Sequence, residues 1–506
     1  MKNIKSFFQK TTLSLLAISA LGACDDFLST PPQGQISVDA IKSDPNAAET
    51  LVTGVYNNLW DANMHGFSYV GLTNIASDDA DKGSTAADGA TTYGQMDNLT
   101  ADPSNGLLNS VWSAYYRTIA RANQALDKIP LSPATQDTRN RLTGEVRFLR
   151  AYCYFNLVRF WGGVTLLSNL PSVDELGNPV LQKRASKEET YALIISDLEY
   201  AKNNLPIKGN TSTAVGRATK GAAMGLLSKV FLYQKNYQRA FALADSVVKN
   251  QAGTYSLLPV YENIWRAAGA NGSESLFEVQ TGTNLSCNAA ISLYTVCQGP
   301  RAGGLRGWTD LGFGFGGPSA TLLAEYEAGD LRRNATVITI SSTSGTVLWD
   351  GFRVPRRDSV ENSFYNYKAY HSRTAEPNCG VNDRLPKNLR ILRLAEVILI
   401  RAEAALALGN TATALTDVNA LRKRAGLKDV ANIDREKIWK ERRVELALEH
   451  DRSFDLIRQE DLQPGRAVDA FKAHSKTFVK GKHELFPIPA VQIQLSGGAL
   501  TQNPGY

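Results

Sequence analysis

Aromatic side chains in a long stretch without helical periodicity offer the clearest binding chemistry of this chain. This stretch, about residues 254–388, is called the second insertion here, and it contains the Gly-rich run Gly304–Gly317. A pyranose ring has an apolar face of C–H groups that packs on aromatic rings, while polar side chains bind its hydroxyls. The candidate stacking residues are Trp308, Phe313, Phe315 and Tyr294, with Trp308 as the main platform.

A second irregular stretch, about residues 66–108, precedes the first long predicted helices and is called the first insertion. It is rich in Asp, Gly, Thr and Asn, and Asp78, Tyr93 and Asn98 could supply polar or edge contacts to a ligand. Long segments without periodicity in a folded protein often carry function. We therefore expect a ligand site built from both insertions, although each aromatic side chain could equally pack in the core.

Nucleotide and metal chemistry are weakly supported. Gly312–Gly317 contains GxGxxG, but a dinucleotide site requires a preceding apolar strand, and Arg301–Leu311 is rich in Gly and Arg. Asp79, Asp81 and Gly83 have the spacing of a calcium loop that lacks its last acidic ligand, so a polar loop is the better interpretation. No Cys/His spacing indicates a metal site. We predict no cofactor and no metal.

Catalytic motifs are missing from the sequence as well. It contains neither GxSxG nor HExxH, and its five histidines are scattered. Glu441, Glu445 and Glu449 recur every four residues on one predicted helix, together with oppositely charged neighbours three residues away, which suits packing better than catalysis. We predict a non-enzymatic binding protein. A hydrolase with two carboxylates across a glycosidic bond and a scaffold for protein partners stay as alternatives.

The elements that must position these residues are helical hairpins. Gly216–Asn250 shows two apolar helical runs around a polar break, and Arg393–Leu427 repeats the pattern. Small residues stand twelve apart in both, which is the tetratricopeptide (TPR) spacing. A generic helical bundle is the alternative. We expect an all-α fold with helices near 145–161, 219–233, 237–249, 392–408, 411–424 and 434–458.

Composition agrees with a folded body. The chain has 506 residues, of which 43% are hydrophobic and 21% charged, and its net charge is +6. It has no block of Lys and Arg, so we expect no nucleic-acid partner.

The N-terminus indicates export and lipidation. A Lys-containing start and a short apolar run lead to Leu21–Cys24, which resembles the bacterial lipobox. We predict a signal peptide over 1–23, diacylglycerol on Cys24, and a lipidated tether over 24–38. Asp25 and Asp26 resemble the surface-export signal of Bacteroidota lipoproteins, which implies an outer-membrane, lipid-anchored protein exposed on the cell surface.

The other cysteines indicate a buried thiol and one possible disulfide. Cys153 lies in an apolar helix and suits a buried free thiol. Cys287 and Cys297 are ten residues apart and could form a disulfide in an exported protein, a choice that the sequence leaves open. Cys379 has no evident mate.

A series of motifs along nearly the whole mature chain resembles the SusD/RagB family of outer-membrane nutrient-binding lipoproteins. Each motif is weak alone, but their number and order are specific. They are the lipobox with Cys24–Leu28, Glu145–Tyr152, Trp161–Val164, Gly216–Thr219, Arg393–Ala404, Val418–Gly426, Glu441–Leu446, Asp451–Leu456, Pro487–Pro489 and Gln502–Tyr506.

The resemblance implies a SusD-like fold of about four TPR-like hairpins. It implies a single domain over 39–506, whose insertions at about 66–108 and 254–388 carry the ligand site. It also implies a SusC-like TonB-dependent transporter as the partner and an oligosaccharide as the ligand, while the RagB branch of the family takes peptides.

Overall fold

Long helices build most of the molecule. The computed structural model describes residues 37–175, 178, 182–210, 214–281, 293–303, 311–378, 380 and 385–506. The main helices are α4 (Ala47–Asn57), α8 (Gly106–Lys128), α9 (Gln136–Trp161), α10 (Lys187–Asn204), α11 (Lys220–Tyr233), α12 (Tyr237–Val248), α16 (Leu394–Ala407), α17 (Thr411–Arg424), α18 (Arg435–Glu445) and α19 (Arg452–Glu460). From α4 to α18, each helix of this series packs on the next one. The predicted all-α fold is confirmed.

The α11–α12 hairpin shows why these sequences form helix pairs. The Thr219 side chain accepts a hydrogen bond from the Ala222 backbone N–H at the start of α11, and the Asn236 side chain caps α12 in the same way. Ser228 and Ala240, the two small residues of the repeat pattern, are both fully buried. A Cβ on Gly225 would lie 2.7 Å from a Leu276 methyl group, so a larger residue here would require the Leu276 side chain to move. Small residues thus bring the layers together.

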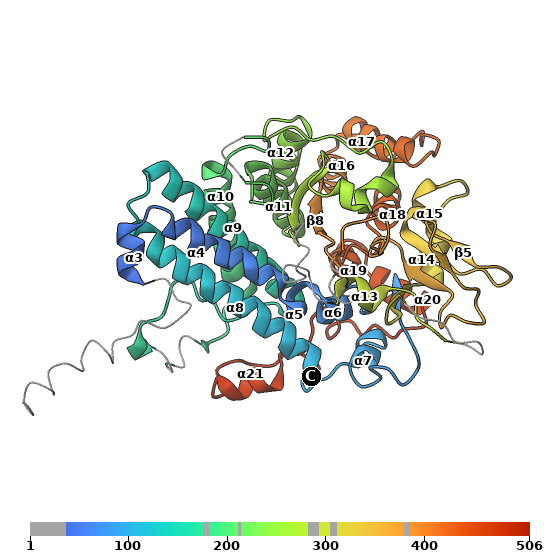
Figure 1. Cartoon of the computed structure of the whole chain (residues 1–506), viewed down its shortest axis with the longest axis horizontal. Helices are drawn as coiled ribbons and strands as arrows, with labels where there is room; N and C mark the ends of the chain where they lie inside the picture. Colours follow the sequence, from blue (N-terminus) through green and yellow to red (C-terminus); the bar gives the residue numbers. More distant parts are fainter. Residues whose placement is uncertain are drawn as a thin grey trace, which may run out of the picture.

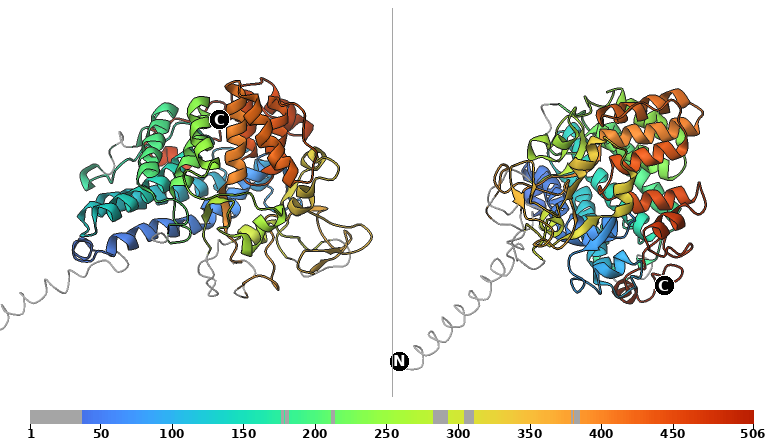
Figure 2. Two further views of the ribbon diagram at one scale, coloured as in Figure 1. Left: turned by 90° about the horizontal axis from the view of Figure 1, so that it is seen from above. Right: turned by 90° about the vertical axis from the view of Figure 1, so that its right-hand side faces the viewer.

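The second hairpin, α16–α17, repeats this design. Asn410 caps α17 by accepting from the Thr413 N–H, and Ala402 and Ala414 are fully buried. Figure 2 shows the green α10–α12 and the orange α16–α18 standing in one row above the blue and teal helices. The helices predicted near 219–233, 237–249, 392–408 and 411–424 agree with the structure to within two residues. The helix predicted near 145–161 is α9, which begins earlier, at Gln136.

The helix predicted over 434–458 is wrong. It is broken between α18 and α19, where Leu448 and His450 have positive φ angles of 63° and 72°. The first insertion holds this break, since the Asn74 side chain donates to the Leu448 carbonyl and accepts from the His450 N–H. Glu449 therefore lies outside α18 and not in line with Glu441 and Glu445. Such non-Gly backbone conformations persist only where surrounding contacts fix them.

The remaining elements are short. The helical ones are α3 (Val38–Ser43), η1 (Asn58–Trp60), α5 (Ala62–His65), α6 (Phe67–Val70), η2 (Gly71–Ile75), α7 (Tyr93–Asp97), η3 (Ile129–Leu131), η4 (Val173–Glu175), η6 (Tyr261–Trp265), η7 (Ala267–Gly269), α13 (Tyr294–Gln298), α14 (Ala320–Glu325), α15 (Leu331–Thr336), α20 (Arg466–Ala473) and α21 (Ala490–Leu495). The strands are β1 (Ala80–Gly83), β2 (Ser275–Val279), β3 (Phe315–Pro318), β4 (Val337–Thr339), β5 (Thr346–Val347), β6 (Arg353–Val354), β7 (Phe364–Asn366) and β8 (Leu389–Arg393).

The described strands form four antiparallel pairs, β1–β3, β2–β8, β4–β7 and β5–β6. In Figure 1, α18 and α19 lie between the helices around α9 and the short elements around α14, α15 and β5. Among the described residues, no helix combines the length and the apolar character that a membrane crossing requires.

A buried ion network fixes the second insertion to the helical body. The Glu445 carboxylate accepts from Arg393 at 2.6 Å, from Arg332 at 3.0 Å and from Arg424. Its backbone carbonyl accepts from the Tyr261 hydroxyl at 2.6 Å. Burial opposes the charge of Glu445, but the guanidinium groups of Arg424, Arg393 and Arg332 outweigh it and hold its pKa well below the ordinary value. Glu445 is therefore charged and fully paired.

We predict that Glu445→Gln destabilises the protein strongly. The amide would leave the buried charges of Arg393, Arg424 and Arg332 undercompensated, so the free energy of unfolding should fall by about 3–5 kcal/mol. Chemical denaturation measures it. Glu188→Gln, the same change on an exposed position of α10, should cost less than about 0.5 kcal/mol. Equal losses in the two variants would contradict a central role of Glu445.

Candidate functional site

The two insertions meet in one strand pair. β1 from the first insertion pairs with β3 from the second, with Gly83 opposite Phe315 and Ala80 opposite Pro318. Gly83 has φ +68°, and a Cβ there would lie 2.3 Å from the Gly314 carbonyl oxygen. Close contact at this point therefore requires Gly. The sequence predicts a site formed by both insertions, and the structure does bring them together here.

An aromatic cluster lies beside this strand pair. Phe67 stacks on Tyr93 with ring centroids 4.1 Å apart, and Phe315 meets both rings at 4.7 and 5.1 Å. Tyr93 and Phe315 are at least nine-tenths buried, and burial raises the pKa of Tyr93. Phe313, two residues before β3, is 36% exposed, with its centroid 6.3 Å from Phe67. Phe313 therefore offers a ring to solvent, supported from behind by the cluster.

An ion pair lies next to the Phe313 backbone. The Arg301 guanidinium lies 2.8 Å from a carboxylate oxygen of Asp88 and donates to the Ser84 hydroxyl at 2.9 Å. It also donates to the Phe313 carbonyl at 3.5 Å. Hydrogen bonds from Thr85 and Ser84 hold the pKa of Asp88 below its ordinary value, so Asp88 is charged at neutral pH. We call Phe67, Phe313, Asp88 and Arg301 the junction surface; Ser84 is buried and hydrogen-bonds to both Asp88 and Arg301.

Two of the predicted ligand contacts belong to the framework instead. Asp78 is 1% exposed, and its carboxylate accepts two hydrogen bonds from Arg452, at 2.7 and 2.8 Å, while Arg443 lies 2.9 Å away. Burial opposes ionisation of Asp78, but Arg452 and Arg443 lower its pKa well below the ordinary value. Tyr294 is 5% exposed and lies 3.3 Å from the His450 ring nitrogen. Neither side chain is accessible to a ligand here, and both anchor the insertions.

The other predicted site residues are either buried, exposed or outside the described residues. Phe315 and Tyr93 support the junction surface from inside. Asn98 is exposed at the end of α7, and its ligand contact stays a prediction. Trp308 and Cys24 lie outside the described residues, so their roles stay predictions too.

Of the two cysteines that could pair in the second insertion, the structure describes Cys297 alone. Cys287 and Cys379 lie outside the described residues, but Cys297 is a buried free thiol that donates to the Tyr294 carbonyl at 3.3 Å. Burial raises the pKa of Cys297 well above its ordinary value, which keeps it protonated. Cys297 therefore takes no part in a disulfide within the described part of the chain. Cys153 is a buried free thiol, as expected.

Two weak motifs have structural explanations. The GxGxxG run ends in β3, and its Gly314 carbonyl accepts from the Ser84 N–H at 2.8 Å, so the run serves strand pairing. In the run that resembles a calcium loop, Asp79 is buried and accepts from Arg443 at 2.8 Å. Asp79 is therefore an ion-pair partner of α18 and not a calcium ligand.

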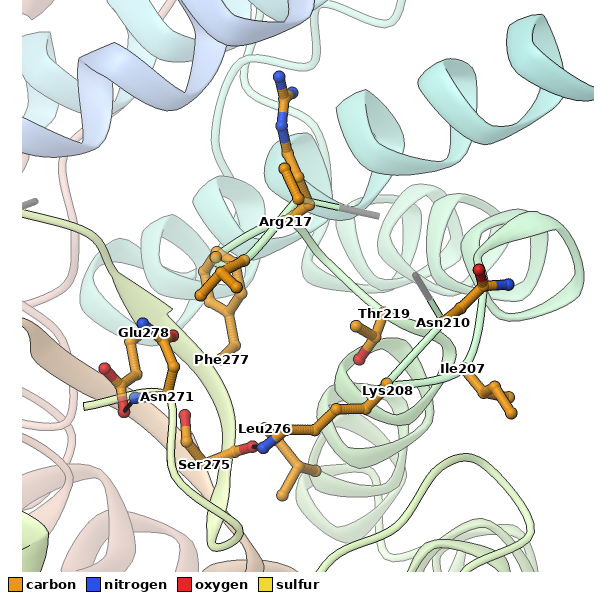
Figure 3. Close-up of a pocket in the computed structure, with 14 residues that line it drawn as sticks. Ile207, Lys208, Asn210, Arg217, Thr219, Asn271, Ser275, Leu276, Phe277 and Glu278 are labelled. Carbon is orange, nitrogen blue, oxygen red and sulfur yellow. Dashed lines mark hydrogen bonds between the residues drawn. The ribbon is translucent and has the colours of Figure 1, made fainter. Parts of the chain in front are cut away.

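A separate pocket of about 370 Å³ lies between the loop before α11 and β2 (Figure 3). The Lys208 ammonium donates to the Gly272 and Ser275 carbonyls. The Arg217 guanidinium points away from the other labelled residues and pairs with Glu145. The main charged groups of this pocket are thus engaged with the protein itself, which makes it less suited than the junction surface to bind sugar hydroxyls.

The polar residues at the junction surface were not predicted from the sequence. Ser84, Asp88 and Arg301 match no motif. Arg301 and Ser84 form a hydrogen bond although they are 217 residues apart in the sequence. The only signal was the concentration of Gly and polar residues in both insertions.

Comparison with known proteins defines the family. A family model described as SusD family matches residues 273–506, and a second, described as starch-binding associating with outer membrane, matches residues 27–232. A SusD-like protein of Bacteroides ovatus is 28% identical over 92% of this chain and 85% of its own length. The two models together cover most of the chain. This protein belongs to the SusD family.

Solved structures of SusD-like and glycan-binding proteins share this fold. A laminarin binding SusD-like protein is 28% identical and has a TM-score of 0.77, covering 91% of this chain and 99% of its own. Surface glycan-binding protein A from Bacteroides fluxus is 25% identical, with a TM-score of 0.74 and the same coverage of both chains.

We predict that two aromatic residues of this site differ sharply in their effect on stability. Phe315→Ala should lower the free energy of unfolding by about 3–5 kcal/mol, because it empties a buried aromatic cluster. Phe313→Ala should cost less than about 1 kcal/mol, because its ring is exposed. Urea denaturation of the two variants tests this. A greater loss from Phe313→Ala would place Phe313 in the core and remove it from the junction surface.

Proposed function

We propose that this protein binds an oligosaccharide at the junction surface and passes it to a SusC-like TonB-dependent transporter. The observation that carries the proposal is an exposed ring, Phe313, next to the Arg301–Asp88 ion pair. The ring offers the flat apolar face that a sugar ring packs on. The ion pair offers charged donors and acceptors for neighbouring hydroxyls, and charge-assisted hydrogen bonds are the strong ones.

Family relations support a glycan as the ligand. The solved structure with 28% identity is that of a laminarin binding SusD-like protein, and one matching family model is described as starch-binding. Trp308 stands only five residues before Phe313 in the sequence. We propose Trp308 as a second platform.

The location follows from the N-terminus. We propose that residues 1–23 are removed as a signal peptide, that Cys24 carries the lipid, and that residues 24–38 tether one domain, 39–506, to the outer membrane. On the cell surface this domain would hold glycan over its transporter. The role proposed for it is capture and transfer, without hydrolysis.

We predict that removing either platform weakens glycan binding without unfolding the protein. Phe313→Ala and Trp308→Ala should each weaken binding by about 1–3 kcal/mol, which is roughly five- to 150-fold in affinity. Isothermal titration with laminarin and starch oligosaccharides measures this. The control is Trp349→Ala, which removes another exposed aromatic side chain and should leave affinity unchanged.

Three outcomes would count against the proposal. Undiminished glycan binding by both platform variants would remove the ligand from the junction surface. Binding of peptides in place of glycans would favour the RagB-like alternative. Release of new reducing ends during the incubation, lost on a single carboxylate substitution, would make the protein a hydrolase.

A further inference from the structure

Three potential metal ligands from distant parts of the chain converge beside β1. Asp81 lies in β1, Asp97 ends α7, and His474 follows the last residue of α20. One carboxylate oxygen from each Asp and one ring nitrogen of His474 all lie within 4.8 Å of one another. None of the three residues belongs to the junction surface.

The surroundings of His474 point to a bound cation. Its side chain is only 8% exposed, and its Nε2 atom is buried without a hydrogen-bond partner in the described part of the chain. The same Nε2 atom lies 3.0 Å from a carboxylate oxygen of Asp81, in a geometry that makes no hydrogen bond. In the tautomer that carries its proton on Nδ1, the Nε2 atom presents a lone pair to Asp81, and two lone pairs in contact repel. A cation bound by both would turn the repulsion into attraction.

Asp97 also presents a buried atom that makes no hydrogen bond. Its Oδ1 atom is buried and accepts no hydrogen bond from any residue within the described ranges, although the Lys476 ammonium is 2.8 Å away. That ammonium is directed elsewhere, since it donates to the carbonyls of Ile75, Ser77 and Ala80. Lys476 thus leaves Asp97 with unused acceptor capacity, but its charge should moderate the affinity of a nearby metal.

We propose that Asp81, Asp97 and His474 bind a divalent transition-metal ion, with Zn²⁺ the best match. One imidazole and two carboxylates are a ligand set that zinc accepts, whereas calcium and magnesium prefer oxygen ligands alone. Three protein ligands leave further positions for water. The Asp81 side chain is 56% exposed, which gives the ion a path from solvent.

Such an ion would tie β1 to the C-terminal part of the chain. Asp81 itself lies opposite Gly317 in the β1–β3 pair, so the metal would hold the strand pair from the side of α20. The metal site does not depend on the proposed function, because metal binding is measured without any glycan.

The test is titration of the chelator-stripped protein with zinc chloride, followed by calorimetry. The wild-type protein should bind one equivalent, and zinc should raise its unfolding temperature. His474→Ala and Asp81→Asn each remove a direct ligand and should weaken binding by at least about tenfold, since even changes outside the ligand shell often cost that much.

Matched controls are His483→Ala, which changes another histidine of the same C-terminal region, and Asp102→Asn, which changes another exposed carboxylate of the first insertion. Both should bind zinc as the wild-type protein does. Asp81 is exposed enough that Asp81→Asn should fold normally, and its unfolding temperature without metal checks this. No binding by the wild-type protein, or equal affinity in all four variants, would overturn the proposal.

Discussion

The charge of Glu445, buried between three arginines, is the constraint on which the arrangement of this protein depends. A buried carboxylate is costly unless it is fully paired. Here the partners come from α15, α17 and the end of β8. Satisfying one side chain therefore forces three distant segments to meet at α18. The network contributes a defined arrangement more than it contributes net stability, because replacing buried ion pairs by apolar groups often costs little.

The first insertion reaches the same place by a second set of charges. Arg443 of α18 pairs with Asp78 and Asp79, and Arg452 of α19 makes two hydrogen bonds to Asp78. Both insertions are thus anchored on one helix pair, although they are about 150 residues apart in the sequence. The β1–β3 pair and the junction surface follow from this shared anchor.

The sequence predicts those features that depend on near neighbours. The hairpins α11–α12 and α16–α17 could be predicted because helical periodicity, small contact residues and capping side chains lie within a few positions of one another. The break between α18 and α19 could not, since Asn74 holds it from almost 400 residues away. The same long range misled the assignment of Asp78, whose type suits a ligand contact but whose partners are two distant arginines.

The site was predictable as a region and not as a set of residues. Gly and aromatic content marked both insertions, but which ring faces solvent depends on the strand pair. Within two positions the chain changes from Phe313, which is exposed, to Phe315, which is buried. The polar partners Asp88 and Arg301 come together only through the fold.

Hydrogen–deuterium exchange with and without a bound laminarin oligosaccharide tests the central claim most directly. If the ligand site is formed by two insertions held on one anchor, backbone amides of residues 80–88 and 311–318 should gain protection together, while those of α11 and α12 stay unchanged. Protection confined to residues 207–210 and 214–219, which line the pocket of Figure 3, or to one insertion alone, would contradict this account.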